Sequence, residues 1–135
     1  RQVVGWALSR SLDHGLVLKA LERARQKRKP EPGLMIHSDR GVQYACTGFR
    51  QVLKRYGYVQ SMSRKADCWD NSVAESFFHL LKSELIYHYA WYGYADVHAA
   101  LFEYIELFYN RERTHSTLGY LTPVDFEQQA LKIAA

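Results

Sequence analysis

Residues 34–41 have the sequence LMIHSDRG, in which an apolar run gives way to a polar turn. Residues 34–37 are apolar enough for a short buried strand, and the turn residues Ser38, Asp39, Arg40 and Gly41 end it. In open α/β sheets, ligands bind at the carboxyl ends of the strands. We therefore expect Asp39 at the rim of a sheet, where its carboxylate either serves a binding site or caps the turn through its own backbone.

Strands and helices are predicted to alternate on both sides of this stretch. Asp13 and Thr47 are expected helix caps, Gly57 a helix end, and Thr122-Pro123 the start of a last helix. The predicted strands are Val3–Leu8, Leu34–His37 and Tyr58–Met62, and the predicted helices run from Asp13 to about Arg28, Gly48 to Tyr56, Ser72 to Tyr89 and Asp96 to Arg111. This order indicates an α/β fold with a mostly parallel sheet.

Three strands make a thin sheet for such a fold. The chain also begins at Arg1 without an initiator Met and enters an apolar run at once. Both features favour a chain that lacks upstream strands. The Val3–Leu8 strand would then expose an unpaired edge, through which we expect self-association.

Composition places the chain among folded proteins of a reducing compartment. Hydrophobic residues make up 47% and charged residues 24% of the 135 positions, enough to bury a core. The two cysteines have no framework spacing, and no apolar run or leader indicates a membrane span or secretion. A single soluble domain, residues 1–135, in the cytoplasm is expected.

The charge balance is mildly basic. There are 18 Lys and Arg against 14 Asp and Glu, a formal charge of +4, with eight cationic residues within positions 1–30. A basic balance favours a polyanionic partner. For the first 30 residues alone, a solvated helix face is the favoured interpretation.

Glu75 lies in the first turn of the predicted helix at 72–89. Ser72 and Glu75 fit a capping box, in which the glutamate only closes the helix start. Alternatively, an earlier cap leaves Glu75 free, and Glu75, His79 and Lys82 then line one polar side. The opposite side would carry Val73, Phe77, Leu80 and Leu81 toward the core.

The pair Asp39 and Glu75 is more informative than either residue. Thirty-five residues separate them, and the interval holds a helix, a strand and a polar stretch that let the second helix return to the sheet rim. Clustered carboxylates hold the hard cations of two-metal phosphoryl transfer. The pair therefore predicts a site for divalent metal.

The sequence resembles the integrase-core DDE transposases encoded by two-frame bacterial insertion sequences. The resemblance rests on four ordered blocks that cover essentially the whole chain. They are Val4-Gly5-Trp6-Ala7, the block from His37 to Tyr44, the blocks Ser61–Lys65 and Asp70–Phe78 with Leu81-Lys82, and the C-terminal signature from Tyr104 to Pro123. Ala66 and Asp67 depart from the family, where Gly and Asn are usual.

The resemblance implies a ribonuclease-H-like integrase core, a three-layer α/β/α fold, here lacking its first strands. It implies Asp39 and Glu75 as two of three catalytic carboxylates, the third being an Asp upstream of Arg1. It further implies two Mg²⁺ ions, with Mn²⁺ as a substitute, DNA ends and target DNA as substrates, and a homo-oligomer.

Several residues are candidates for contact with DNA. Arg64, Lys65 and Lys82 suit phosphate, His79 shares the polar side of Glu75, and Trp69 suits stacking on a base. Arg111, Arg113 and His115 either bind DNA or hold the C-terminal helices together.

Three functions remain open at this point. The first is a transposase or integrase core that cuts and joins DNA ends by two-metal phosphoryl transfer. The second is a nuclease that only hydrolyses, and the third is a non-catalytic DNA-binding or assembly fragment. The C-terminal signature favours transposase over nuclease, and the missing first Asp leaves enzymatic activity of the 135-residue chain itself uncertain.

Overall fold

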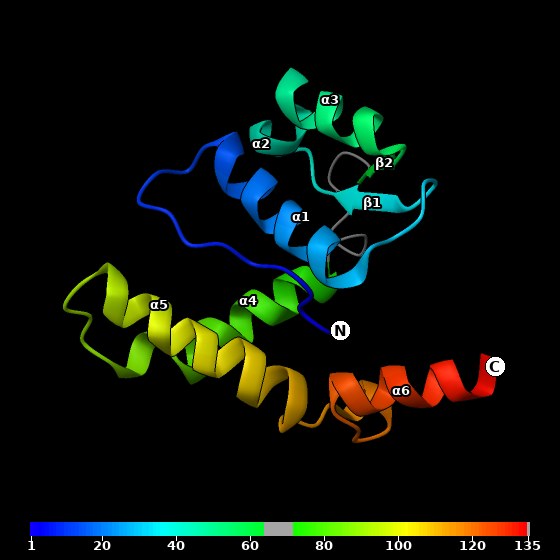
Figure 1. Ribbon diagram of the computed structural model, residues 1–135. Helices are drawn as coiled ribbons and strands as arrows, with labels where there is room; N and C mark the ends of the chain where they lie inside the picture. The colour runs from blue at the N-terminus through cyan, green and yellow to red at the C-terminus, as the bar shows by residue number, and fades with distance from the viewer. Residues whose placement is uncertain (64–71, 135) are drawn as a thin grey trace. The chain divides into compact units, whose positions relative to one another are not determined.

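The computed structural model describes residues 1–63 and 72–134 (Figure 1). The chain divides into two compact units. The N-terminal unit is Val4–Glu75, and the C-terminal unit combines Arg1–Val3 with Ser76–Ala135. Among the described residues, no helix is both long enough and apolar enough to cross a bilayer.

The N-terminal unit contains a two-stranded parallel sheet with helices before and between its strands. Its elements are α1 (His14–Arg28), β1 (Met35–Ser38), α2 (Val42–Ala45), α3 (Thr47–Tyr56) and β2 (Val59–Met62). The strands pair in register from Met35 with Val59 to Ser38 with Met62. The predicted α/β order and parallel pairing are confirmed for these two strands.

The helix ends follow local signals. Asp13 caps α1 by accepting a hydrogen bond from the Leu16 amide at 3.2 Å, as predicted. Gly57 ends α3 with a φ of 70°, a conformation in which a side chain is strained. The cap of α3 is Cys46, whose Sγ accepts from the Phe49 amide, and not Thr47. The short α2 was not predicted.

The core of the N-terminal unit lies where α1 and α3 meet. Phe49 and Leu53 of α3 are each 2% exposed, and Tyr58 beside β2 is also buried. Partly buried apolar side chains of α1, β1 and the α2 region surround them. An α3 face with apolar residues at helical spacing thus covers the sheet that carries Asp39.

The predicted strand at Val3–Leu8 is wrong, because these residues have no regular secondary structure. A strand needs a neighbour to bind its backbone groups, and in the described part of the chain only β1 and β2 pair as strands. Residues of this segment pack on α1 instead. A Cβ on Gly5 would lie 2.6 Å from the Ala24 amide, so only glycine permits the approach. The expected self-association through a Val3–Leu8 edge loses its basis.

The C-terminal unit is helical. Its elements are the greater part of α4 (Ser72–Glu84), the 3-10 turn η2 (Ile86–His88), α5 (Tyr94–Phe102), the π-helical η3 (Glu103–Tyr109), the 3-10 turn η4 (Ser116–Leu118) and α6 (Pro123–Ala134). The predicted helix from Ser72 to Tyr89 therefore ends earlier, at Glu84. Thr122 starts α6 as predicted, with its hydroxyl accepting from the Asp125 amide at 3.1 Å.

On the predicted helix from Asp96 to Arg111, α-helical spacing puts Val97, Leu101, Ile105 and Phe108 on one inward stripe, and the π-helical segment changes this expectation. Leu101 and Ile105 are buried as expected, but Phe108 is 38% exposed and Tyr109 is 1% exposed. The Asn110 amide donates to the Ile105 carbonyl, which is the spacing of a π-helix. The wider turn of the π-helix shifts the buried position by one residue toward the C-terminus. Tyr109 is therefore buried where Phe108 was expected to be.

Candidate active site

Asp39 directly follows β1 and is exposed. Its Oδ1 accepts a hydrogen bond from the Gly41 amide at 2.8 Å, so the expected turn cap is present. Within the described residues, Oδ2 forms no hydrogen bond or ion pair. A Cβ on Gly41 would lie 2.9 Å from Oδ1, so a larger residue at this position would displace the Asp39 carboxylate. One carboxylate oxygen thus fixes the side chain, and the other has no partner among residues 1–63 and 72–134.

The backbone around Asp39 is held by the residue after β2. The Ser63 amide donates to the Ser38 carbonyl at 2.9 Å, and Arg40 Nε donates to the Ser63 carbonyl at 2.9 Å. Ser38 and Ser63 are both buried. These bonds join the carboxyl ends of the two strands, so Asp39 extends from a fixed rim.

The sequence pointed to His37 only as the first residue of the block from His37 to Tyr44. In the structure, its side chain lies beside this rim. Its Nδ1 lies 2.9 Å from Ser61 Oγ and its Nε2 lies 3.2 Å from Ser63 Oγ. The strand register already pairs His37 with Ser61, which is the signal that could have predicted the contact. The imidazole links the two strand ends next to Asp39.

Glu75 lies in the first turn of α4 and is exposed. Ser72 is already a helical residue of α4, and residues 64–71, where an earlier cap would lie, are outside the described residues. His79 and Lys82 are also exposed, as the polar side predicts. Val73 is 53% exposed, contrary to expectation, so the apolar side that packs begins at Phe77.

Asp39 and Glu75 belong to the same compact unit. Residues 1–63 and 72–134 contain no group of three or more His, Cys, Asp or Glu side chains that could hold a metal ion. The approach of Asp39 to Glu75 stays a prediction.

The candidate DNA contacts fall into three groups. Arg64, Lys65 and Trp69 lie outside the described residues, as do Ala66 and Asp67. His79, Lys82 and Arg111 are exposed. Arg113 is partly buried and His115 is 6% exposed.

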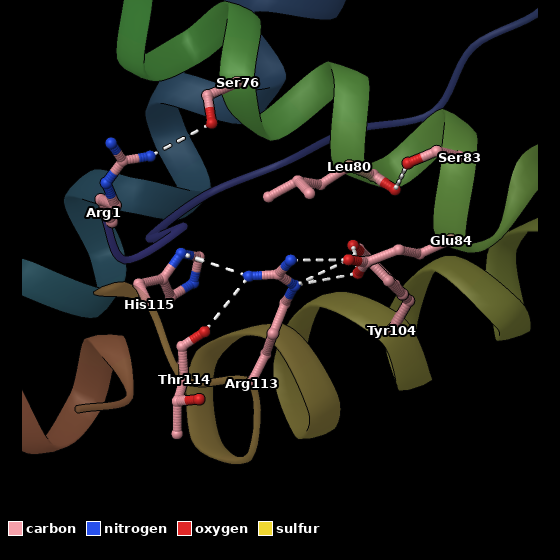
Figure 2. A network of polar contacts seen from close by, with 9 residues as sticks. All are labelled: Arg1, Ser76, Leu80, Ser83, Glu84, Tyr104, Arg113, Thr114 and His115. Carbon is pink, nitrogen blue, oxygen red and sulfur yellow. Dashed lines mark hydrogen bonds and ion pairs between the residues drawn. The ribbon is translucent and has the colours of Figure 1, made fainter. Parts of the chain in front are cut away.

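Arg113 and His115 belong to a polar network in the C-terminal unit, hereafter the Glu84 network (Figure 2). Arg113 Nη2 lies 2.7 Å from Glu84 Oε1, and Nε donates to both carboxylate oxygens, at 2.9 and 3.0 Å. The Tyr104 hydroxyl donates to Glu84 Oε2 at 2.7 Å, and Arg113 Nη1 lies 3.4 Å from His115 Nδ1. Of the two roles left open, these contacts favour holding the C-terminal helices together.

The environment of the Glu84 network also shifts the pKa values of Glu84 and His115. Hydrogen bonds from Arg113 hold the pKa of Glu84 below its ordinary value, with Tyr104 adding to the effect. Burial lowers the pKa of His115, and the charge of Arg113 acts in the same direction. His115 Nε2 is buried and has no hydrogen-bond partner among the described residues. Glu84 was not singled out in the sequence, since its partner lies 29 positions away.

Two family models match the chain, and both describe an integrase core domain. One matches residues 1–68 and the other residues 75–131. The matches cover both strands with Asp39, and Glu75 with the helices after it. Between them they leave out residues 69–74, of which residues 69–71 lie outside the described residues.

Curated relatives are transposases and related insertion-element proteins. The transposase for insertion sequence element IS904 from Lactococcus lactis is 40% identical over 95% of this chain and 51% of its own length. The transposase InsF for insertion sequence IS3fB from Escherichia coli is 41% identical over 97% of this chain and 46% of its own length. An uncharacterized 31 kDa protein of insertion element IS600 from Shigella sonnei is 39% identical over 99% of this chain and 49% of its own length. The chain spans about half the length of these relatives.

Proposed function

Because the chain belongs to the integrase core domain family, we propose that the protein is a DNA transposase in which Asp39 and Glu75 are catalytic carboxylates. The relatives at about 40% identity are named as transposases of insertion sequences. The observation that carries the assignment is the rim geometry of Asp39. It places an exposed carboxylate, one oxygen of which has no partner in the part of the chain that the structure describes, at the carboxyl end of a parallel strand, where α/β folds bind their ligands.

The donor set suits a hard divalent cation. Mg²⁺ and Mn²⁺ prefer carboxylate oxygens, and the two proposed ligands are an Asp and a Glu that both face solvent. Bound between carboxylates, such ions activate an attacking hydroxyl and stabilise a leaving oxygen in phosphoryl transfer. Asp39 would contribute Oδ2, because Oδ1 is occupied by the Gly41 amide. Two carboxylates make a partial set, and a third would complete it.

The distribution of charge suits DNA on the N-terminal unit. Residues 4–75 carry 13 Lys and Arg against 7 Asp and Glu, whereas the C-terminal unit carries 5 against 7. Phosphate contacts dominate the affinity of sequence-independent binding. We propose Arg64, Lys65 and Lys82 as phosphate contacts, Trp69 as a base contact, and His79 and Arg111 as further candidates. Arg113 and His115 leave this set because they are engaged in the Glu84 network.

One observation favours a second function for the 135-residue chain by itself. The described residues contain no group of three potential metal ligands. Loss of a bridging ligand removes metal affinity and the alignment of the reacting oxygens. Alone, the chain would then bind DNA or partners without joining DNA ends.

The test is a DNA-end joining assay with the complete transposase. Asp39→Asn and Glu75→Gln are each expected to lower the rate by about two to four orders of magnitude while leaving DNA binding within a few-fold. Glu112→Gln is the matched control, since this exposed glutamate forms no side-chain hydrogen bond or ion pair with the described residues. Full activity of Glu75→Gln would refute the catalytic assignment.

A further inference from the structure

The C-terminal unit contains a pocket of about 660 Å³ that the proposed DNA chemistry does not use. It lies between the end of α4, the segment at 89–92, and the continuous helix formed by α5 and η3. All of its lining residues belong to this one unit. A pocket of this size accommodates a large side chain with its neighbours.

Aromatic side chains form much of the wall. Tyr104, which is 6% exposed, and Phe108 come from η3, and Tyr89, Trp91 and Tyr92 come from the preceding segment. Trp91 is fixed, because its Nε1 donates to the Ile86 carbonyl at 3.2 Å. Its ring lies 5.9 Å from that of Tyr89. The faces of such rings attract cations.

Carboxylates are the charged groups of the pocket. Glu84 is neutralised by Arg113, but Asp96 and Glu103 are exposed and form no ion pair with the described residues. Asp96 accepts a hydrogen bond from the Tyr92 amide at 3.3 Å and from no other described residue. Neither Lys, Arg nor His lines the pocket. Aromatic walls with two unneutralised carboxylates favour a guanidinium or an ammonium group, and they repel phosphate.

A complementary surface exists on α3 of the same sequence. Arg50, Lys54 and Arg55 are exposed, and none of them forms a side-chain hydrogen bond or ion pair with the described residues. Arg50 and Lys54 are four positions apart and therefore share one face of the helix. The apolar face of α3, with Phe49 and Leu53, is buried in the core, so the cationic face points outward.

We propose that this aromatic, acidic pocket binds a cationic side chain of α3 from a second copy of the chain. Opposite net charge on the two units makes a second copy the complementary partner. The contact is separate from the proposed catalytic residues. It places a protein-binding function on the unit that carries more acidic than basic residues.

The experiment measures self-association of the full chain by sedimentation equilibrium at about 50 mM and about 500 mM NaCl. Glu103→Lys is expected to weaken association at least tenfold, and so is the triple variant Arg50→Glu, Lys54→Glu, Arg55→Glu. Glu112→Lys makes the same charge change in the same unit outside the pocket and should leave association within twofold. Circular dichroism confirms that each variant is folded.

The deciding measurement mixes the two disrupted variants. Glu103→Lys with the α3 triple variant should regain association as a hetero-complex, because the opposed charges are restored across one interface. A monomer at every concentration in low salt overturns the proposal. Equal weakening by Glu103→Lys and Glu112→Lys, or no recovery on mixing, also overturns it.

Discussion

Arg113 and Glu84 form a bidentate ion pair, with the Nη2–Oε1 distance at 2.7 Å and Nε within 3.0 Å of both carboxylate oxygens. Their side chains are 21% and 29% exposed, so water competes only partly for these groups. The pair connects the end of α4 to the segment after η3 (Figure 2). Bidentate, partly buried geometry makes such a pair stronger than an ordinary surface salt bridge.

Arg113→Ala is expected to lower the free energy of unfolding by about 1–3 kcal/mol, because Glu84 loses charge-assisted hydrogen bonds and keeps its charge. Arg113→Lys should recover only part of the loss, since an ammonium cannot form the planar double contact. Urea denaturation measures both. Arg111→Ala, an exposed neighbour, should change the value by less than about 0.5 kcal/mol.

The same pair predicts a dependence of stability on pH. Since Arg113 lowers the pKa of Glu84 in the folded state, the contribution is complete above the unfolded glutamate pKa of about 4.3. It is lost as pH falls through the lowered folded value. The stability difference between wild type and Glu84→Gln should therefore shrink as the pH falls from about 5 into the acid range. In an Arg113→Ala background, the stability difference caused by Glu84→Gln should be smaller and should change less with pH. An identical pH profile in that background would contradict the assignment of the pH dependence to the Arg113–Glu84 pair.

Asn110 holds the backbone of Val3 within the C-terminal unit, which is a second stabilising contact of this unit. Its Oδ1 accepts from the Val3 amide and its Nδ2 donates to the Val3 carbonyl, both at 2.9 Å, and the residue is 2% exposed. Asn110→Asp removes the donor and buries a charge, so unfolding free energy should fall by about 1–3 kcal/mol. Val3→Pro removes the N–H donor of the same contact. Additive effects of Asn110→Ala and Val3→Pro in urea denaturation would show that the bonds contribute nothing.

Features encoded by adjacent residues were predictable from the sequence. The Asp13 cap, the Gly57 end, the β1 and β2 positions and the start of α6 all depend on neighbours within a few positions. Asp39 could be placed at a strand end for the same reason.

Features that depend on distant partners were not predictable. The Val3–Leu8 strand failed because strand formation requires a pairing partner, and Val3 finds the Asn110 side chain instead. The π-helical turn moved Tyr109 inward, although the apolar spacing suited an α-helix equally well. The Arg113 role depended on Glu84, which no local pattern identified.

DNA binding is expected to be weak, independent of sequence and steeply dependent on salt, because phosphate contacts dominate it. Replacing Lys65 and Lys82 together by Ala should lower the affinity and flatten the slope of log affinity against log salt by about 1–2. Fluorescence anisotropy with a labelled duplex measures the slope. Lys132→Ala on α6 is the control, and a slope unchanged by the double variant would remove these lysines from the DNA path.

The last prediction concerns the approach of Asp39 to Glu75. If both bind one cation, their carboxylates lie within about 8 Å, since metal–oxygen distances are about 2.0–2.6 Å. Substoichiometric Mn²⁺ should then broaden the carboxyl NMR signals of both residues together and leave that of Glu112 sharp. Asp39→Asn should abolish the broadening at Glu75 at the same Mn²⁺ concentration, because a single carboxylate holds the ion too weakly. Broadening at Asp39 alone, with Glu75 unaffected, would separate the two residues and end the shared-metal assignment.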